Sequence, residues 1–382
     1  MFTTYFGMVV NVLLLINEVL KKIGERLFDL PLGKPSFSDP RYISHDFNLS
    51  HFHSIGDSGR DSMMSFVDGG NGLVFGAPNF AIHLTRVCFN LFMGATRCMP
   101  KNLPSIIEFY TISCASYSGG RIFYETEFVP AREEWVKFLP GNKDLIFDSF
   151  DPALRTGSTR VPISRVAEVA RLFAEWRYAG YIIEEELDSG DMLIRDGTLQ
   201  TMTPNESKYA DETERKALSK NAIIIGLSKT SSLLTTTGLS LFAAIGELAE
   251  SSAVAGSSWF YHPIVDITHP EHRAEMYAVK LHPQSDYVFK LEIFKPQAKA
   301  MSFGEIEASI GDIAANSCDG AFPGYPYGLL DADRFARVSY EEKESRKIQF
   351  LACAYKDGLF ERLKKCHKSS DAHDVINAMV KS

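Results

Sequence analysis

Two aspartates, each followed by a glycine, are the residues of this chain best suited to metal chemistry. Asp68 closes one apolar, strand-like run and Asp196 closes another. A glycine after the aspartate lets the chain turn sharply or approach a ligand closely. Either Asp-Gly pair alone is typical of a hairpin turn. Two such carboxylates side by side at the edge of a sheet, however, would bind a divalent metal ion.

Further residues occur where a phosphate-cleaving site needs charge. Glu175 lies on the flank of a predicted helix, four residues after Arg171, a spacing that by itself is typical of a surface ion pair. Lys229 ends a continuous apolar run, where a lysine either extends to solvent at a sheet edge or contacts phosphate. Tyr325 lies in a Gly-Tyr-Pro-Tyr turn, where it either packs or contacts substrate, and Asp333 follows at the front of a late helix.

The composition is that of a globular protein. The 382 residues are 45% hydrophobic and 23% charged, which is enough for one large domain or two modest ones. A formal net charge of −8 argues against a general polyanion-binding surface, so any contact with nucleic acid must be local or mediated by metal. The six cysteines form no C-x-x-C pair or zinc-type spacing and indicate a reducing cytoplasm. Four histidines without ligand spacing are predicted to be loop residues: His262, His269, His272 and His282.

An apolar run near the N-terminus, Val9–Ile16, invites comparison with a membrane anchor or a signal sequence. Asn11 interrupts it and Glu18 follows it, whereas a membrane-spanning helix needs about 20 apolar residues. No basic region precedes the run and no small-residue cleavage site follows it. The pattern therefore predicts a buried or partner-facing helix and no association with membranes.

The periodicity along the chain alternates between strand-like and helical. Residues 30–62 are rich in Pro, Ser and His and are predicted to form an irregular connector. Antiparallel strands are predicted at 62–68, 73–93 and 105–129, a helix with an apolar stripe at 162–187, a solvated helix at 205–220, a buried strand at 222–229, a strand pair at 276–281 and 287–294, and one long helix from Leu329 towards Ala354.

This order of elements predicts an α/β fold with a ribonuclease-H-like mixed sheet flanked by helices, and with helical N- and C-terminal extensions. The expected divisions are residues 1–60, 61–345 and 346–382. Two strand-end carboxylates, one acid on a crossing helix and one on a late helix can hold two divalent cations about 4 Å apart. Phosphodiester hydrolysis suits such a site, because charge builds on the phosphate oxygens in the transition state, where fixed cations act most strongly.

At these positions the chain resembles the NurA nucleases. The resemblance implies a DNA nuclease that uses Mn²⁺, with Mg²⁺ as the alternative and two ions in the site, and that degrades ends from 5′ to 3′ and cuts single strands. It also implies a homodimer acting with a HerA-type hexameric ATPase in DNA-end resection. The matching segments are Val67-Asp68-Gly69, Arg171 with Glu175, Leu193–Leu199, Gly226-Leu227-Ser228-Lys229 and Gly324-Tyr325-Pro326-Tyr327.

One position departs from the family pattern, because Asp333 stands where a histidine usually follows the Tyr-Pro-Tyr element. An aspartate can bind metal there, but it cannot switch charge near pH 7 as an imidazole does. Two alternatives stay open: a non-catalytic adaptor or clamp for an ATPase, and another ribonuclease-H-like nuclease such as a junction resolvase. The expected metal ligands are Asp68, Glu175, Asp196 and Asp333, with Lys229 for phosphate charge and Tyr325 for positioning the substrate.

Overall fold

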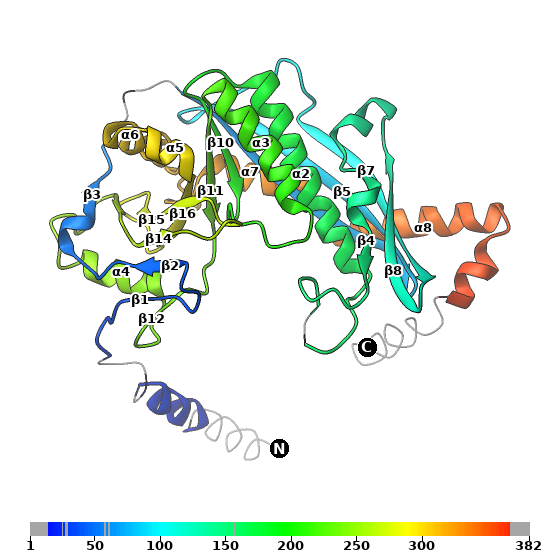
Figure 1. Ribbon diagram of the computed structural model, residues 1–382, viewed down its shortest axis with the longest axis horizontal. Helices are drawn as coiled ribbons and strands as arrows, with labels where there is room; N and C mark the ends of the chain where they lie inside the picture. Colours follow the sequence, from blue (N-terminus) through cyan, green and yellow to red (C-terminus); the bar gives the residue numbers. More distant parts are fainter. Residues whose placement is uncertain are drawn as a thin grey trace, which may run out of the picture.

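The computed structural model describes residues 14–24, 26, 30–56, 59, 62–155 and 157–366. A sheet of 12 strands runs through the molecule with helices on both faces, and two two-stranded sheets lie outside it (Figure 1). The strands are β1 (Pro35–Ser36), β2 (Tyr42–Ser44), β3 (Phe52–Ser54), β4 (Met63–Ala77), β5 (Phe80–Met93), β6 (Thr96–Cys98), β7 (Ile106–Ser118), β8 (Arg121–Pro130), β9 (Phe147–Asp148), β10 (Met192–Asp196), β11 (Ile223–Ser228), β12 (Leu234–Thr235), β13 (Trp259–Tyr261), β14 (Val265–Ile267), β15 (Ala274–Lys280) and β16 (Phe289–Phe294).

The helices are of two kinds, short 3-10 turns and longer α-helices. Residues 14–24 are helical as well. The others are η1 (Leu49–His51), η2 (Glu133–Phe138), η3 (Asn142–Leu145), α2 (Ser164–Glu186), α3 (Glu206–Lys220), α4 (Leu241–Ala249), α5 (Lys295–Ala300), α6 (Phe303–Ala315), α7 (Tyr327–Ala336) and α8 (Tyr340–Lys356). None of the helices in the described part of the chain is both long enough and apolar enough to cross a membrane.

The centre of the large sheet has the strand order β7-β5-β4-β10-β11. β4, β5 and β7 form an antiparallel meander. The chain then crosses through α2 and returns as β10, which pairs parallel to β4, and α3 leads to β11, which pairs parallel to β10. The predicted α/β fold with a ribonuclease-H-like mixed sheet flanked by helices is confirmed.

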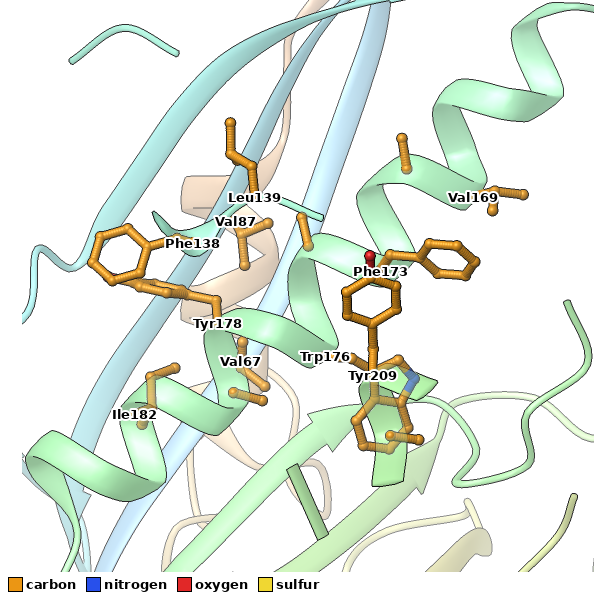
Figure 2. Close-up of a cluster of buried hydrophobic side chains, with 14 of the residues drawn as sticks. Val67, Val87, Phe138, Leu139, Val169, Phe173, Trp176, Tyr178, Ile182 and Tyr209 are labelled. Atoms are coloured by element: carbon orange, nitrogen blue, oxygen red, sulfur yellow. The ribbon is translucent and has the colours of Figure 1, made fainter. Parts of the chain in front are cut away.

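Helix α2 packs on one face of this sheet because its apolar residues recur at helical spacing. Val169, Phe173 and Trp176 are buried, as the predicted stripe requires. Figure 2 shows these side chains in the same buried cluster as Val67 of β4 and Val87 of β5. α2 therefore crosses the meander at the strand that carries Asp68.

Helix α7 covers the opposite face of the same strands (Figure 1). Successive side chains of a strand point to opposite faces, so Val67 faces α2 while Phe66 and Asp68 face α7. The approach is close, since a Cβ added at Gly328 of α7 would lie 2.0 Å from the Phe66 ring. A glycine is thus needed there for α7 to reach the sheet.

Two predicted elements at the ends of the fold are wrong, and both expected divisions cut through the structure. The connector at 30–62 is not wholly irregular, because β3 pairs with β13 at the edge of the 12-stranded sheet; a division at residue 60 therefore cuts through the sheet. The long late helix is two helices, since α7 ends at Ala336 and Ser339 caps the start of α8 by accepting from the Glu342 backbone N–H. The division at residue 345 falls inside α8.

Helix α3 differs from expectation in its exposure, and the N-terminal helix is not buried, which was the first of the two expectations for it. α3, predicted to be solvated, buries Tyr209, Ala210 and Ala217 against its neighbours. In the N-terminal segment, Leu15, Val19 and other apolar residues of the helix at 14–24 are exposed. The first part of the predicted Val9–Ile16 run lies outside the described residues.

Candidate active site

Asp68 and Asp196 lie on neighbouring parallel strands. Arg195 pairs with Val67, so the next residues in register are Asp196 and Asp68, and both face α7. Asp196 ends its strand as predicted, whereas β4 continues past Asp68 to Ala77, which corrects the expectation that Asp68 closes a strand. Asp68 is 8% exposed, and its Oδ1 accepts the Gly69 backbone N–H at 2.7 Å.

Lys229, Tyr325 and Asp333 converge on Asp196. The Lys229 ammonium lies 2.7 Å from Asp196 Oδ2 and 3.8 Å from Asp333 Oδ1. The Tyr325 hydroxyl donates to Asp196 Oδ1 at 3.4 Å, and Lys229 Nζ lies 5.6 Å from the centre of the Tyr325 ring. Since Tyr325 is only 1% exposed, its ring is not available to stack on a base, and the hydroxyl is the part that reaches the site.

Glu175 reaches the sheet from the other face, beside Gly69. A Cβ at Gly69 would lie 2.3 Å from Glu175 Oε1, so only glycine leaves room for this carboxylate. Arg171 pairs with Glu175 Oε1 and donates to the Gly69 carbonyl O at 3.0 Å. Arg195 Nη2 lies 3.5 Å from Glu175 Oε2. Both oxygens of Glu175 are therefore paired with arginines.

The electrostatics of Asp68 indicate a deficit of positive charge. Burial, together with the negative charges of Glu175 and Asp196, raises the pKa of Asp68 to about 8, and Lys229 offsets this only in part. Burial alone would lower the pKa of Lys229, but its hydrogen bond to Asp196 and the nearby acids raise it overall. Burial and the charge of Asp196 also raise the pKa of Tyr325. Lys229 and Tyr325 thus stay protonated.

The donor set suits a hard divalent cation. Asp68 and Asp196 offer adjacent carboxylate oxygens, the ligand type that Mn²⁺ and Mg²⁺ prefer, and an ion bound there would remove the charge imbalance at Asp68. Across the described ranges, no three His, Cys, Asp or Glu side chains are arranged to hold an ion. Glu175 and Asp333 instead pair with the protein's own cations, and they would have to leave these partners to become ligands.

Arg195 is a site residue that sequence reasoning missed. It is buried, with its guanidinium 4.2 Å from the centre of the Trp176 ring. It also donates to the Thr198 carbonyl O at 2.6 Å and contacts Glu175. Arg195 therefore ties α2 to the turn that follows Asp196. The available signal was an arginine inside an otherwise apolar strand, directly before the candidate ligand.

A second missed group, centred on Glu292 of β16, holds the same turn. Glu292 is fully buried and accepts from the Leu199 backbone N–H at 2.7 Å, the Thr198 hydroxyl at 2.8 Å and the Lys290 ammonium at 2.6 Å. His272 Nε2 lies 2.8 Å from Glu292 Oε1, the oxygen that Lys290 also contacts. Burial alone would raise the pKa of Glu292, but His272 and Lys290 hold it well below its usual range. The four histidines lie outside strands and helices as predicted, yet His272 is part of this buried network.

No protein-family model matches the chain, and no curated protein matches it. Among solved structures, the chain is similar to Argonaute from Aquifex aeolicus, with 10% identity and a TM-score of 0.25 in one structure, and 9% and 0.28 in a second. A third, Aa-Ago with externally bound siRNA, has 8% identity and a TM-score of 0.27. Each comparison covers 73% of this chain but only 28% of the Argonaute chain.

Proposed function

We propose that this protein is a metal-dependent nuclease that hydrolyses phosphodiester bonds of DNA. The observation that carries the proposal is the meeting of Asp68 and Asp196 on adjacent parallel strands, with Lys229 and Tyr325 both in contact with Asp196. Paired carboxylates in a ribonuclease-H-like sheet can hold cations against a phosphate, and a nearby ammonium can share the phosphate charge.

Each residue has a distinct role in this proposal. Asp68 and Asp196 hold Mn²⁺ or Mg²⁺, with Glu175 and Asp333 joining when they leave their arginine and lysine partners. A bound ion would supply Lewis-acid stabilisation and an activated water. Lys229 presents a positive charge to the phosphate, and the Tyr325 hydroxyl orients Asp196.

The finer proposal is a 5′-to-3′ exonuclease and single-strand endonuclease that acts as a homodimer with a HerA-type hexameric ATPase in end resection. Its support is the family resemblance and two physical features. A net charge of −8 leaves little electrostatic means of capturing DNA, so a motor that delivers the strand would compensate. The exposed apolar helix at 14–24 offers a surface for a second copy or for the ATPase.

A cleavage assay on end-labelled linear DNA tests the function directly. We expect products with Mn²⁺ or Mg²⁺ and none with chelator, and more products from duplex ends when a HerA-type ATPase is added. Absence of cleavage with either ion would contradict the nuclease. Light scattering tests the dimer, and removal of residues 1–22 should reduce the stimulation by the ATPase more than the basal cleavage of single strands.

The adaptor function is the second candidate, and one observation favours it. Both oxygens of Glu175 are bound by arginines, so one of the four expected ligands is held away from a metal. An adaptor would alter the ATPase without cleaving DNA under any metal condition. The same assay with a four-way junction in place of linear DNA would identify a junction resolvase.

A further inference from the structure

A cavity of about 500 Å³ extends away from the carboxylates along the ends of β15 and β16. It shares the segment from Ser228 to Ser231 and the side chain of Lys290 with a second cavity, of about 540 Å³, which contains Asp196. The first cavity therefore begins at the candidate active site. Lys280 and Tyr287 also line the first cavity.

A row of aromatic rings follows the same direction. Tyr325, whose hydroxyl contacts Asp196, has its ring centre 6.4 Å from that of Phe322. Phe322 stacks in turn on Tyr287, with centres 5.4 Å apart and planes 25° apart. Whereas Tyr325 is buried, Tyr287 is 56% exposed and Phe322 is 38% exposed. The rings thus lead from the carboxylate to the surface.

The two turns that carry the exposed rings are locked together. Gly324 has φ of +97°, and a Cβ there would lie 2.5 Å from Ser285 Cβ, so this turn packs directly on the next one. Ser285 is buried, and its hydroxyl accepts the Tyr287 backbone N–H at 3.1 Å. The rings are therefore held in place at the surface, which lowers the entropy cost of binding a flat ligand.

We propose that Tyr287 and Phe322 form a platform on which the bases of single-stranded nucleic acid stack, next to the candidate active site. Every base has a π-face, so such stacking is independent of sequence. Lys280 and Lys290 line the cavity, and so do three acids: Glu247 of α4, Glu250 directly after that helix, and Asp286. In this proposal the phosphates contact Lys280 on the way to Lys229. The identity of the ligand rests on the proposed function.

The test measures binding without cleavage. Fluorescence anisotropy of a 5′-labelled dT12 is recorded with the full chain in chelator, over a series of salt concentrations. Tyr287→Leu and Phe322→Leu keep apolar volume but remove a ring, and each should weaken binding about tenfold. Tyr287→Phe keeps the ring and should bind within about twofold of the unchanged protein. Tyr117→Leu, at a tyrosine that is 76% exposed on β7, is the matched control and should bind normally.

Salt dependence separates stacking from charge. Lys280→Gln should lower the slope of log affinity against log salt by about 0.7, the value for one phosphate contact on a single strand, whereas Tyr287→Leu should leave the slope unchanged. Equal affinity for Tyr287→Leu and the unchanged protein would overturn the platform, and so would absence of dT12 binding. A change in oligomeric state on light scattering of Tyr287→Leu would assign the rings to a protein interface and overturn it too.

The outcome is distinguishable from that of the cleavage assay. If the protein cuts DNA while the ring variants bind dT12 normally, the platform is wrong and the nuclease stands. If the protein binds dT12 through the rings but cuts nothing with Mn²⁺ or Mg²⁺, the platform stands and the nuclease is wrong.

Discussion

Asp68-Gly69 and Asp196-Gly197 are the same dipeptide on adjacent strands, yet each glycine is needed for a different reason. Gly69 lies within β4 and pairs with Val87, and its missing side chain makes room for Glu175. Gly197 follows the end of β10 with φ of +104°, and no atom lies within 4 Å of a Cβ added there. Space selects the first glycine, whereas backbone conformation selects the second.

The two carboxylates differ in the same way. Asp196 has a lysine at 2.7 Å and a tyrosine hydroxyl at 3.4 Å, so its charge is balanced within the protein. Asp68 is buried and, within the described part of the chain, makes no ion pair; burial and neighbouring acids raise its pKa to about 8. A cation added to the site therefore changes the surroundings of Asp68 more than those of Asp196.

The largest expected effect is the loss of cleavage when a carboxylate is removed. Asp68→Ala, Glu175→Ala and Asp196→Ala should each lower Mn²⁺-dependent cleavage by about a thousandfold or more, because one missing ligand disables a two-metal site. The Asp68→Ala/Asp196→Ala double variant should be little worse than either single one. Asp46→Ala, at an exposed acid, is the control. If a variant at Asp68, Glu175 or Asp196 cleaved DNA nearly as fast as the unchanged protein, the substituted residue would not be a metal ligand.

The second largest effect should be on the pH dependence of stability, which should differ between variants of Asp68 and of Asp196. In the folded protein the pKa of Asp68, about 8, lies above the ordinary value of 3.8. The contribution of Asp68 to the free energy of unfolding is therefore fully present below pH 3.8 and is lost as the pH rises through 8. Without metal, Asp68→Asn should therefore raise the free energy of unfolding at pH 9 by about 2–5 kcal/mol and change it little at pH 4.

Urea unfolding in chelator at the two pH values measures this difference. Addition of Mn²⁺ to the unchanged protein should restore stability at pH 9, since a bound cation favours the carboxylate form. Asp196→Asn should show no such gain at pH 9, because it breaks the contact with Lys229. A pH profile for Asp68→Asn parallel to that of the unchanged protein would contradict the assigned electrostatics.

Substitutions at Gly69 and Gly197 should have smaller effects on stability and should show how the two glycines differ. Gly69→Ala should destabilise the protein by about 2–3 kcal/mol, because the new methyl group overlaps Glu175. Gly197→Ala should cost about 1–2 kcal/mol, because an alanine resists the positive φ. Added to Gly69→Ala, the substitution Glu175→Ala should recover part of the lost stability. Added to Gly197→Ala, it should recover none. Denaturant unfolding of the two double variants measures both couplings; equal coupling would mean that Gly69 does not make room for Glu175.

The sequence was informative where side-chain periodicity decides the structure. The apolar stripe of α2 and the run before Asp196 both obey local rules, and the ribonuclease-H-like order follows from them. The run after Asp68 was misread as a turn because its glycines are typical of turns. In the structure Gly70 is extended, and a Cβ there would lie 2.2 Å from the Ala336 carbonyl O of α7. That requirement comes from a helix more than 250 positions away, which local pattern cannot show.

Sequence reasoning selected several residues that lie close together in the structure, but not the residues that support them. Lys229 and Tyr325, which were selected from separate sequence segments, both contact Asp196. Arg195 and Glu292 were missed because their role depends on being buried and paired with other residues. A buried charge is tolerated only when it has partners, and those of Glu292 come from the turn after β10 and the loop before β15. Such contacts depend on packing between distant segments, so composition and spacing carried no signal for them.

The smallest expected effect concerns Asp333, the position that departs from the NurA pattern. Its Oδ1 lies 3.8 Å from Lys229 Nζ, and its Oδ2 accepts from Arg337 Nη2 at 2.9 Å. If Asp333 is a metal ligand, Asp333→Asn should weaken Mn²⁺ binding by about three- to tenfold, since an amide is a weaker ligand than a carboxylate.

Two further variants test the same position. Arg337→Gln frees the Asp333 carboxylate without removing it and should leave Mn²⁺ affinity equal or slightly higher. Asp333→His should retain cleavage with a pH profile that gains a step near the histidine pKa, about 6.5. Metal titrations of the three variants decide the matter: identical curves for Asp333→Asn and the unchanged protein would place Asp333 outside the metal site and leave it as the ion-pair partner of Arg337.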